Sequence, residues 1–104
     1  MRFDSETVLQ LRRGIMKRGQ VLSTLLSEVL AGKTPAAVAQ LPGTPGMRPE
    51  EKLRMALDQV EARRKLIDAD DDKFGRCDIC GEDLGLPALG ELPWADRCAA
   101  HAAQ

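Results

Sequence analysis

The sequence is poor in aromatic residues, cysteine and histidine. Among its 104 residues are two Phe, one Trp, no Tyr, three Cys and one His. A chain with so few large side chains builds a thin hydrophobic core, and small domains of this kind commonly depend on a bound metal or a disulfide. The composition therefore predicts a fold that relies on such a cross-link.

Long apolar runs and a recognisable export signal are also missing. No apolar run reaches the roughly 18–20 residues of a membrane span, and Arg2 is followed by Asp4 and Glu6 rather than by an apolar segment. These features favour a cytoplasmic protein with reduced thiols and no membrane partner. An enzyme is not expected, because the sequence shows no nucleophile–base pair and no phosphate-binding loop.

All three cysteines and the histidine fall in one segment near the C-terminus. It reads F-G-R-C-D-I-C-G from Phe74, and C-A-A-H begins at Cys98, with seventeen residues between Cys80 and Cys98. Each half-site places two ligands three residues apart, so both can point at one ion. Thiolate and neutral imidazole suit tetrahedral zinc, and four protein ligands leave no open position for water. We predict one structural Zn²⁺ per chain, bound by Cys77, Cys80, Cys98 and His101.

Three other uses of the cysteines fit less well. A thioredoxin-like redox pair needs a preceding strand, and it leaves Cys98 and His101 without a role. A disulfide scaffold conflicts with the odd number of cysteines. An iron–sulfur cluster is disfavoured by histidine as the fourth ligand. Zinc is the best match.

Two amphipathic segments predict a pair of long helices. The first, about 4–31, begins with Asp4 as N-cap and ends before Gly32. It repeats apolar residues at three- and four-residue steps, with Arg18 at its one polar position. The second, about 49–73, has Pro49 in its first turn and carries its own apolar stripe, with polar residues that include Arg63 and Arg64 over the rest of its surface. The apolar positions are Val8, Leu11, Ile15, Leu22, Leu25, Val29, Leu53, Leu57, Val60 and Ile67.

The connector between them, residues 32–48, is rich in Pro and Gly and leaves room for one short helical turn. Two helices of similar length on such a connector pack antiparallel. We predict an all-α fold, in which an antiparallel helical hairpin (coiled coil) over residues 1–73 is followed by a small C-terminal zinc finger over 74–104. Metal removal is expected to loosen the finger and to leave the helices intact, because their apolar seam is separate.

Inside the finger, the spacing of Gly and Pro predicts turns rather than long elements between the two half-sites. The segment 93–103 is expected to form a short helix that presents Cys98 and His101 on one face. Trp94 is assigned to a small core beside the metal.

Charge is distributed unevenly along the chain. Residues 1–66 hold twelve basic and seven acidic side chains, a net charge of +5, whereas 67–104 have a net charge of −6. Nucleic-acid binding by the basic helical half is therefore one possible function, although scarce aromatics and the acidic finger count against it. A zinc-stapled protein-interaction module is another.

A ten-residue run that starts at Asp72 reads D-K-F-G-R-C-D-I-C-G. Together with Leu89, Pro93, Ala95 and the second half-site, this run resembles the DksA/TraR zinc-finger family. The resemblance is close over 74–101 and looser through the second helix, and it covers about half of the chain. It implies a bacterial factor whose helical hairpin stands next to a zinc finger.

The same resemblance implies a function. Members of the family bind RNA polymerase by inserting the hairpin into its secondary channel, and they do not recognise DNA sequence. We therefore expect a transcription regulator that contacts RNA polymerase directly. Basic residues near the tip of the hairpin, Lys33, Arg48 and Arg54, are the expected partner-binding residues.

The sequence departs from the family pattern at three places. His101 stands where the fourth ligand is usually cysteine, a change that zinc tolerates. Residues 32–49 contain no carboxylate, although family members carry an acidic Asp-x-x-Asp-x-Ala motif at the tip. Leu92, Ala102 and Glu61 stand where basic residues contact the alarmone ppGpp, so a ppGpp response is not expected.

Overall fold

The computed structural model describes residues 2–102. Over this range the elements follow one another as α1 (Ser5–Leu30), η1 (Ala36–Gln40), α2 (Pro49–Asp68), α3 (Leu86–Glu91) and η2 (Ala99–His101), where η marks a short 3₁₀ helix. No strand forms within these residues, and a single isolated β-bridge joins Arg76 to Asp83. None of the helices in this range is both long and apolar enough to cross a membrane. The expected all-helical character is confirmed.

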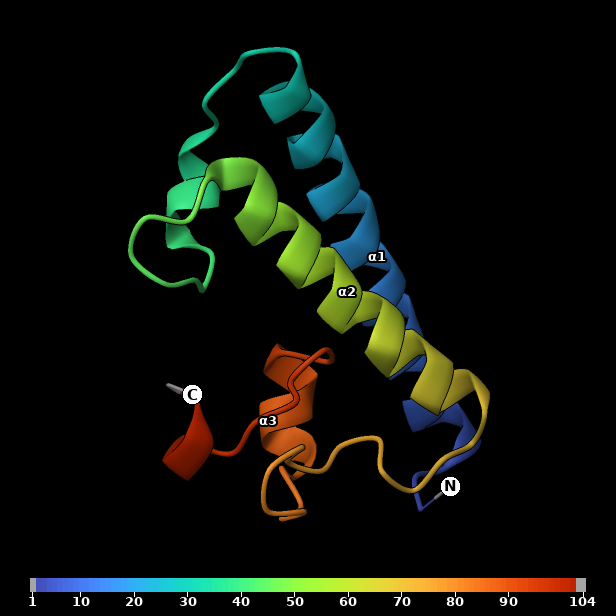
Figure 1. Cartoon of the computed structure of the whole chain (residues 1–104). Coiled ribbons are helices and arrows are strands. Elements are labelled where there is room, and N and C mark those ends of the chain that lie inside the picture. The colour runs from blue at the N-terminus through green and yellow to red at the C-terminus, as the bar shows by residue number, and fades with distance from the viewer. Residues whose placement is uncertain (1, 103–104) are drawn as a thin grey trace.

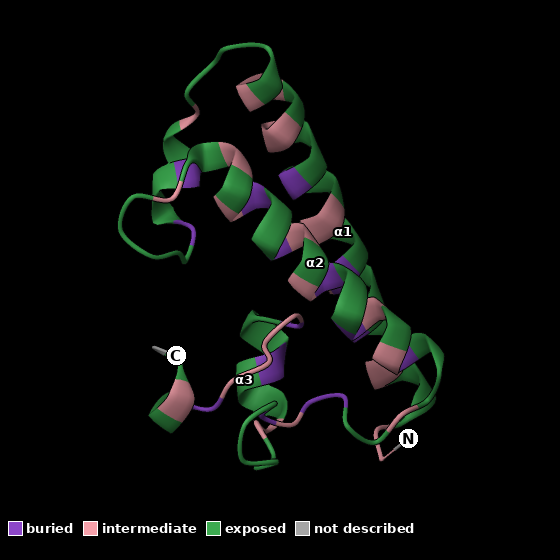
Figure 2. Ribbon diagram, in the orientation of Figure 1, coloured by how far each residue is buried: buried purple, intermediate pink, exposed green. Residues whose placement is uncertain are grey.

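The two long helices α1 and α2 lie side by side and run in opposite directions (Figure 1). Buried residues line the sides on which the helices face each other (Figure 2). The apolar ones are Leu11, Ile15 and Leu22 of α1, and Leu53, Ala56, Val60 and Ile67 of α2. Apart from Ala56, which flanks its stripe, these are positions of the predicted apolar stripes. The stripes therefore direct the pairing of the helices.

Both ends of α1 form as their residue types predict. The Asp4 side chain accepts a hydrogen bond from the Thr7 amide at 2.7 Å, which makes Asp4 the N-cap. At the other end Gly32 adopts φ +87°, and the Lys33 amide donates to the Glu28 carbonyl at 2.9 Å. This left-handed C-terminal cap stops the helix one residue short of the expected boundary.

The second helix is shorter than predicted. It was expected to continue to about residue 73, but α2 ends at Asp68. Asp70 adopts a left-handed conformation with φ +57°, and the Asp71 amide donates to the Leu66 carbonyl at 3.0 Å. This is the same type of cap that ends α1, formed here by aspartate, one of the few non-glycine residues that tolerate positive φ.

The connector folds back onto the helices instead of projecting as a free loop. Its predicted helical turn is η1, which packs against α2 (Figure 1). Val38 and Leu41 are buried and belong to the same hydrophobic cluster as the helix residues. The connector end of the helix pair therefore has its own apolar covering.

One prediction about the finger is wrong, and one agrees with the structure. Between the half-sites the chain forms turns and one short helix, α3, with no long element, and Pro87 occupies the first turn of α3, where the missing amide costs no hydrogen bond. The expected helix over 93–103 is reduced to the three residues of η2, for which Cys98 is the extended N-cap residue. Residue 103 lies outside the described range.

The finger and the helix pair share one core. Phe74 and Leu89 have no exposed surface and belong to the same cluster as the buried residues of α1 and α2. Phe3, just before α1, meets Phe74 edge to face with ring centroids 6.4 Å apart. The helix seam is therefore not separate from the finger, contrary to the expectation from sequence.

α1 also contacts the finger directly. The Gly14 backbone faces Pro93 so closely that a Cβ at this position would lie 2.6 Å from the Pro93 Cγ. One turn further along α1, the Arg18 guanidinium lies over the Trp94 ring, 4.7 Å from its centroid. Arg18, the polar position in the apolar repeat of α1, thus lies where this helix contacts the finger.

Candidate metal centre

The first half-site is a tight turn that follows α2. The Cys77 amide donates to the Glu82 carbonyl at 2.8 Å, and the Gly81 amide donates back to the Cys77 carbonyl at 2.9 Å. Gly81, directly after Cys80, adopts φ +76°, a conformation that favours glycine. The turn also aims the Ile79 amide at the Cys77 sulfur, at 3.4 Å, as a donor to a thiolate.

The second half-site comes from the last turn of the described chain. Cys98 is buried, and the His101 amide donates to the Cys98 carbonyl at 3.0 Å within η2. This short hydrogen-bonded loop brings the imidazole to the same side as the Cys98 sulfur. A three-residue spacing therefore suffices without the longer helix that the sequence predicted.

The four predicted ligands converge on one point. Their ligand atoms all lie within 4.8 Å of one another. The Cys80 and Cys98 sulfurs are 3.7 Å apart, and the Cys77 sulfur is 3.6 Å from the His101 Nδ1. A tetrahedral ion with bonds of about 2.3 Å to sulfur and about 2.0 Å to nitrogen needs ligand separations of about 3.5–3.8 Å. The Cys98–His101 separation is shorter, at 3.1 Å.

The thiols are free and electrostatically unequal. All three described cysteines are unbridged, because even the Cys80 and Cys98 sulfurs stand well beyond the roughly 2.05 Å of a disulfide. Burial raises the pKa of the Cys77 thiol, but backbone hydrogen bonds at Cys80, Cys98 and Ile79 outweigh this and lower the pKa to about 6. Burial raises the pKa of Cys98, and the neighbouring thiols raise it further.

Such crowded thiols ionise together only when a cation compensates their charge. Three cysteines and one histidine with these separations fit the donor set of a structural zinc site. The metal-binding pattern found in the sequence therefore corresponds to a real cluster in space, whose chemistry favours zinc over the oxygen-seeking cations.

The three expected partner-binding residues lie at the opposite end of the molecule. Lys33 follows α1 and is exposed, whereas Arg48 and Arg54 stand at the start of α2. Arg48 donates to Glu51 at 2.7 Å, and Arg54 donates through two nitrogens to Glu50 at 2.9 and 3.0 Å. Exposed pairs of this kind are weak because water and salt screen them, so a partner can displace them.

One residue of the site region was misassigned from sequence. Arg63 was placed on the polar face of the second helix, but it is only 3 % exposed and its guanidinium pairs with Asp78, between Cys77 and Cys80. The signal was available: Arg63 occupies the stripe position between Val60 and Ile67. A charged residue at a buried position of a helix stripe needs a partner from elsewhere in the chain.

Comparison with known proteins gives one significant relative. The chain is 40 % identical over 52 residues to the RNA polymerase-binding transcription factor DksA of Haemophilus influenzae. The match covers 50 % of this chain and 34 % of that protein, so it spans about a third of the relative. No family model matches the chain, and no solved structure matches it significantly. Over half of its length the chain is thus a homologue of DksA, and its Cys₃His cluster agrees with the resemblance to the DksA/TraR zinc-finger family.

Proposed function

We propose that this protein is a transcription regulator that binds RNA polymerase directly through its helical hairpin. The observation that carries the proposal is the 40 % identity over 52 residues to DksA, which is named for binding RNA polymerase. The antiparallel arrangement of α1 and α2 supports it, because a long helical pair supplies an arm that reaches into a partner (Figure 1). No enzymatic activity, DNA sequence recognition or ppGpp response is part of the proposal.

The two parts of the chain have different roles in this function. Residues 1–73 form the hairpin, packed as an antiparallel coiled coil, and 74–104 form the finger. Cys77, Cys80, Cys98 and His101 hold one zinc ion, which with four protein ligands supplies a cross-link and no reactive position. The finger then serves as a base that holds the hairpin in place. The site of action is the bacterial cytoplasm, where transcription takes place.

Lys33, Arg48 and Arg54 are proposed to contact polymerase at the connector end of the hairpin. Residues 32–49 carry two charged side chains, Lys33 and Arg48, and both are basic. A partner that displaces Glu50 and Glu51 from their pairs with Arg54 and Arg48 would therefore meet positive charge here. The surface of polymerase that binds the connector end of the hairpin should then be acidic. The regulator would therefore dock without the acidic tip chemistry of its relatives.

A binding experiment tests the proposal: we expect the immobilised protein to retain RNA polymerase core. Replacing both Lys33 and Arg54 by Glu should weaken retention by about tenfold or more, because like charges then face each other. Arg13→Glu is the matched control, since Arg13 is exposed on α1 away from the connector and carries the same charge. Crosslinkers placed within 32–49 should label residues of the secondary channel.

Failure to retain any polymerase subunit at low salt would contradict the proposal.

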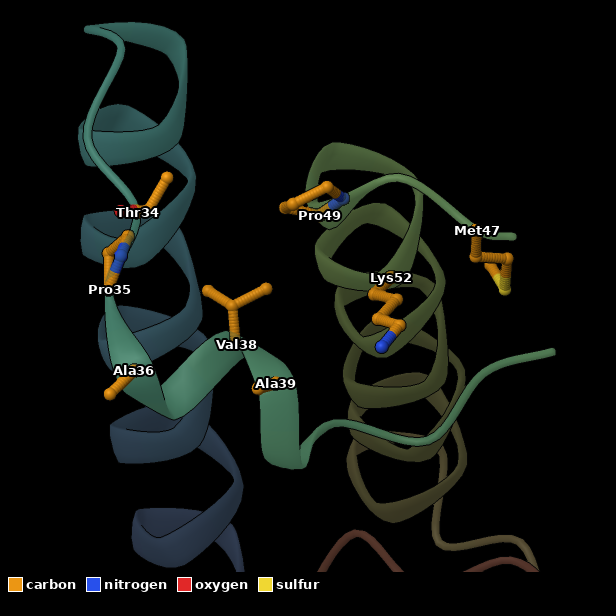
Figure 3. A pocket seen from close by; sticks show the side chains of 8 residues that line it. All are labelled: Thr34, Pro35, Ala36, Val38, Ala39, Met47, Pro49 and Lys52. Atoms are coloured by element: carbon orange, nitrogen blue, oxygen red, sulfur yellow. The ribbon is translucent and has the colours of Figure 1, made fainter. Parts of the chain in front are cut away.

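A feature of the connector supports the alternative, a zinc-stapled module that binds some other protein. A cavity of about 340 Å³ opens between η1 and the start of α2, and its lining is mainly apolar, with Val38, Met47 and Pro49 beside Lys52 (Figure 3). If the polymerase experiment fails, this connector cavity is the surface to probe next.

A further inference from the structure

Arg63 is the one charged residue that is buried among residues 2–102. Its Nη2 donates to the Asp78 carboxylate, which forms an ion pair with it. Its Nε and Nη1 are also buried, and neither has a hydrogen-bond partner within the described structure. Asp78 is therefore the ion-pair partner of a positive charge that sits in the apolar seam of α2.

A buried charge depends strongly on its partner. When one member of a buried ion pair is removed, the remaining charge is left uncompensated at low dielectric. The Asp78 side chain is 46 % exposed, so its own solvation changes little if it moves away. The cost of breaking the pair would fall almost entirely on Arg63 and hence on α2.

Asp78 belongs to the turn that presents the metal ligands. It lies between Cys77 and Cys80, and its amide donates to the Asp96 carbonyl at 2.8 Å, two residues before Cys98. The Asp96 side chain in turn accepts a hydrogen bond from Gln59 of α2 at 3.0 Å.

Gln59 and Arg63 are four residues apart, on the same face of α2. Through them α2 holds one residue of each ligand-bearing segment, Asp78 from the first and Asp96 from the second. The position of Asp78 thus depends on the same turn that a bound ion would fix.

We propose that Arg63 is a positioning residue that couples metal binding in the finger to the stability of α2. A bound ion holds the Cys77–Cys80 turn, the turn holds Asp78, and Asp78 compensates the charge of Arg63 inside the helix pair. Coupling between two sites is reciprocal. If metal binding strengthens the Arg63–Asp78 pair by a given factor, loss of the pair therefore weakens metal binding by the same factor. The inference rests on the proposed metal centre and is independent of polymerase binding.

Competition between the full chain and a chromogenic zinc chelator measures the coupling. Arg63→Met keeps a long side chain and removes the charge, whereas Asp78→Asn keeps the shape of the partner. Each should weaken zinc affinity by about tenfold or more, the range found for residues that support metal ligands. The double variant should bind zinc no more weakly than the single variant with the lower affinity, because both changes break the same interaction.

Arg64→Met is the matched control. Arg64 is the next residue on α2 and carries the same charge, but it pairs with Glu61 and Asp68 of its own helix. The zinc affinity of Arg64→Met should equal that of the native chain. Native affinity in Arg63→Met, or strictly additive losses in the double variant, would overturn the coupling.

Hydrogen exchange supplies a second readout that keeps the inference testable if Arg63→Met does not fold. In the native chain, chelation should lower protection of the amides of 60–68. In Asp78→Asn, which changes only a half-exposed side chain, protection of these amides should be low with or without zinc. Equal protection of 60–68 in zinc-loaded and chelated native protein would overturn the inference. A chain that binds no zinc in the competition assay fails at the metal centre, whatever its behaviour toward polymerase.

Discussion

Cys77→Ser is expected to unfold the finger, residues 74–104, and chelation of the native chain should do the same. Cys77 is 3 % exposed and supplies one of four converging ligands. Structural zinc in zinc-finger peptides binds with an apparent free energy of about 10–16 kcal/mol at pH 7, as much as the entire stability of a typical small domain. Loss of this free energy should make the finger sensitive to protease and remove the protection of its amides from hydrogen exchange.

His101 provides the matched pair of variants for this prediction. His101→Cys creates a four-thiolate set, which is also a structural zinc site, and should keep the finger folded. His101→Ala removes a ligand and should behave like Cys77→Ser. Unchanged protease resistance of 74–104 in Cys77→Ser, with chelator present, would show that the finger folds without a metal.

Phe74→Ala is expected to lower the free energy of unfolding by about 3–5 kcal/mol. Phe74 has no exposed surface, packs edge to face on Phe3 and lies in the cluster shared by the finger and the helices. Truncation leaves a cavity at the point where these parts meet. The loss is large because a sequence with two Phe and one Trp has few other large side chains to fill the gap.

Chemical denaturation with excess zinc measures this loss as a shift of the midpoint at constant slope. Met55→Ala is the control, because Met55 is 45 % exposed on α2 and its truncation should change stability by less than about 0.5 kcal/mol. If Phe74→Ala unfolds at the same midpoint as the native chain, the shared core does not contribute as described. A changed slope would point instead to separate unfolding of finger and helices.

The sequence predicted those features that depend on local chemistry. The start of α1 follows from Asp4 as N-cap, its end from Gly32, and the start of α2 from Pro49, since each residue acts within one turn. The metal cluster followed from two spacings of ligand types, Cys and His, that occur nowhere else in the sequence. These signals involve neighbouring residues and need no knowledge of tertiary contacts.

Features that depend on tertiary contacts or on uncommon backbone conformations were missed. The end of α2 was placed too late because aspartate at positive φ is a weak signal, and the first glycine after this helix, Gly75, lies five residues beyond Asp70. Arg63 was assigned to solvent because charge is the usual mark of an exposed helix position. Its burial depends on Asp78, fifteen residues away in the sequence, and no local rule predicts that pairing.

The function was suggested by the pattern around the ligands and not by composition. Charge asymmetry and scarce aromatics left several classes of protein open, whereas the run beginning at Asp72 indicated one family. The 40 % identity to DksA supports that family over half of the chain. The connector has no counterpart to the family's acidic tip motif, so the manner in which the hairpin engages polymerase is the part of the function that needs experiment.

The zinc content of the purified protein tests the central claim most directly. Native mass spectrometry should show one zinc ion per chain, and all three thiols should resist alkylation until a chelator is added. Cys77→Ser prepared in parallel should lack the ion. A native chain that carries no stoichiometric metal and whose thiols react at once would contradict the account, because the four converging side chains would then hold nothing together.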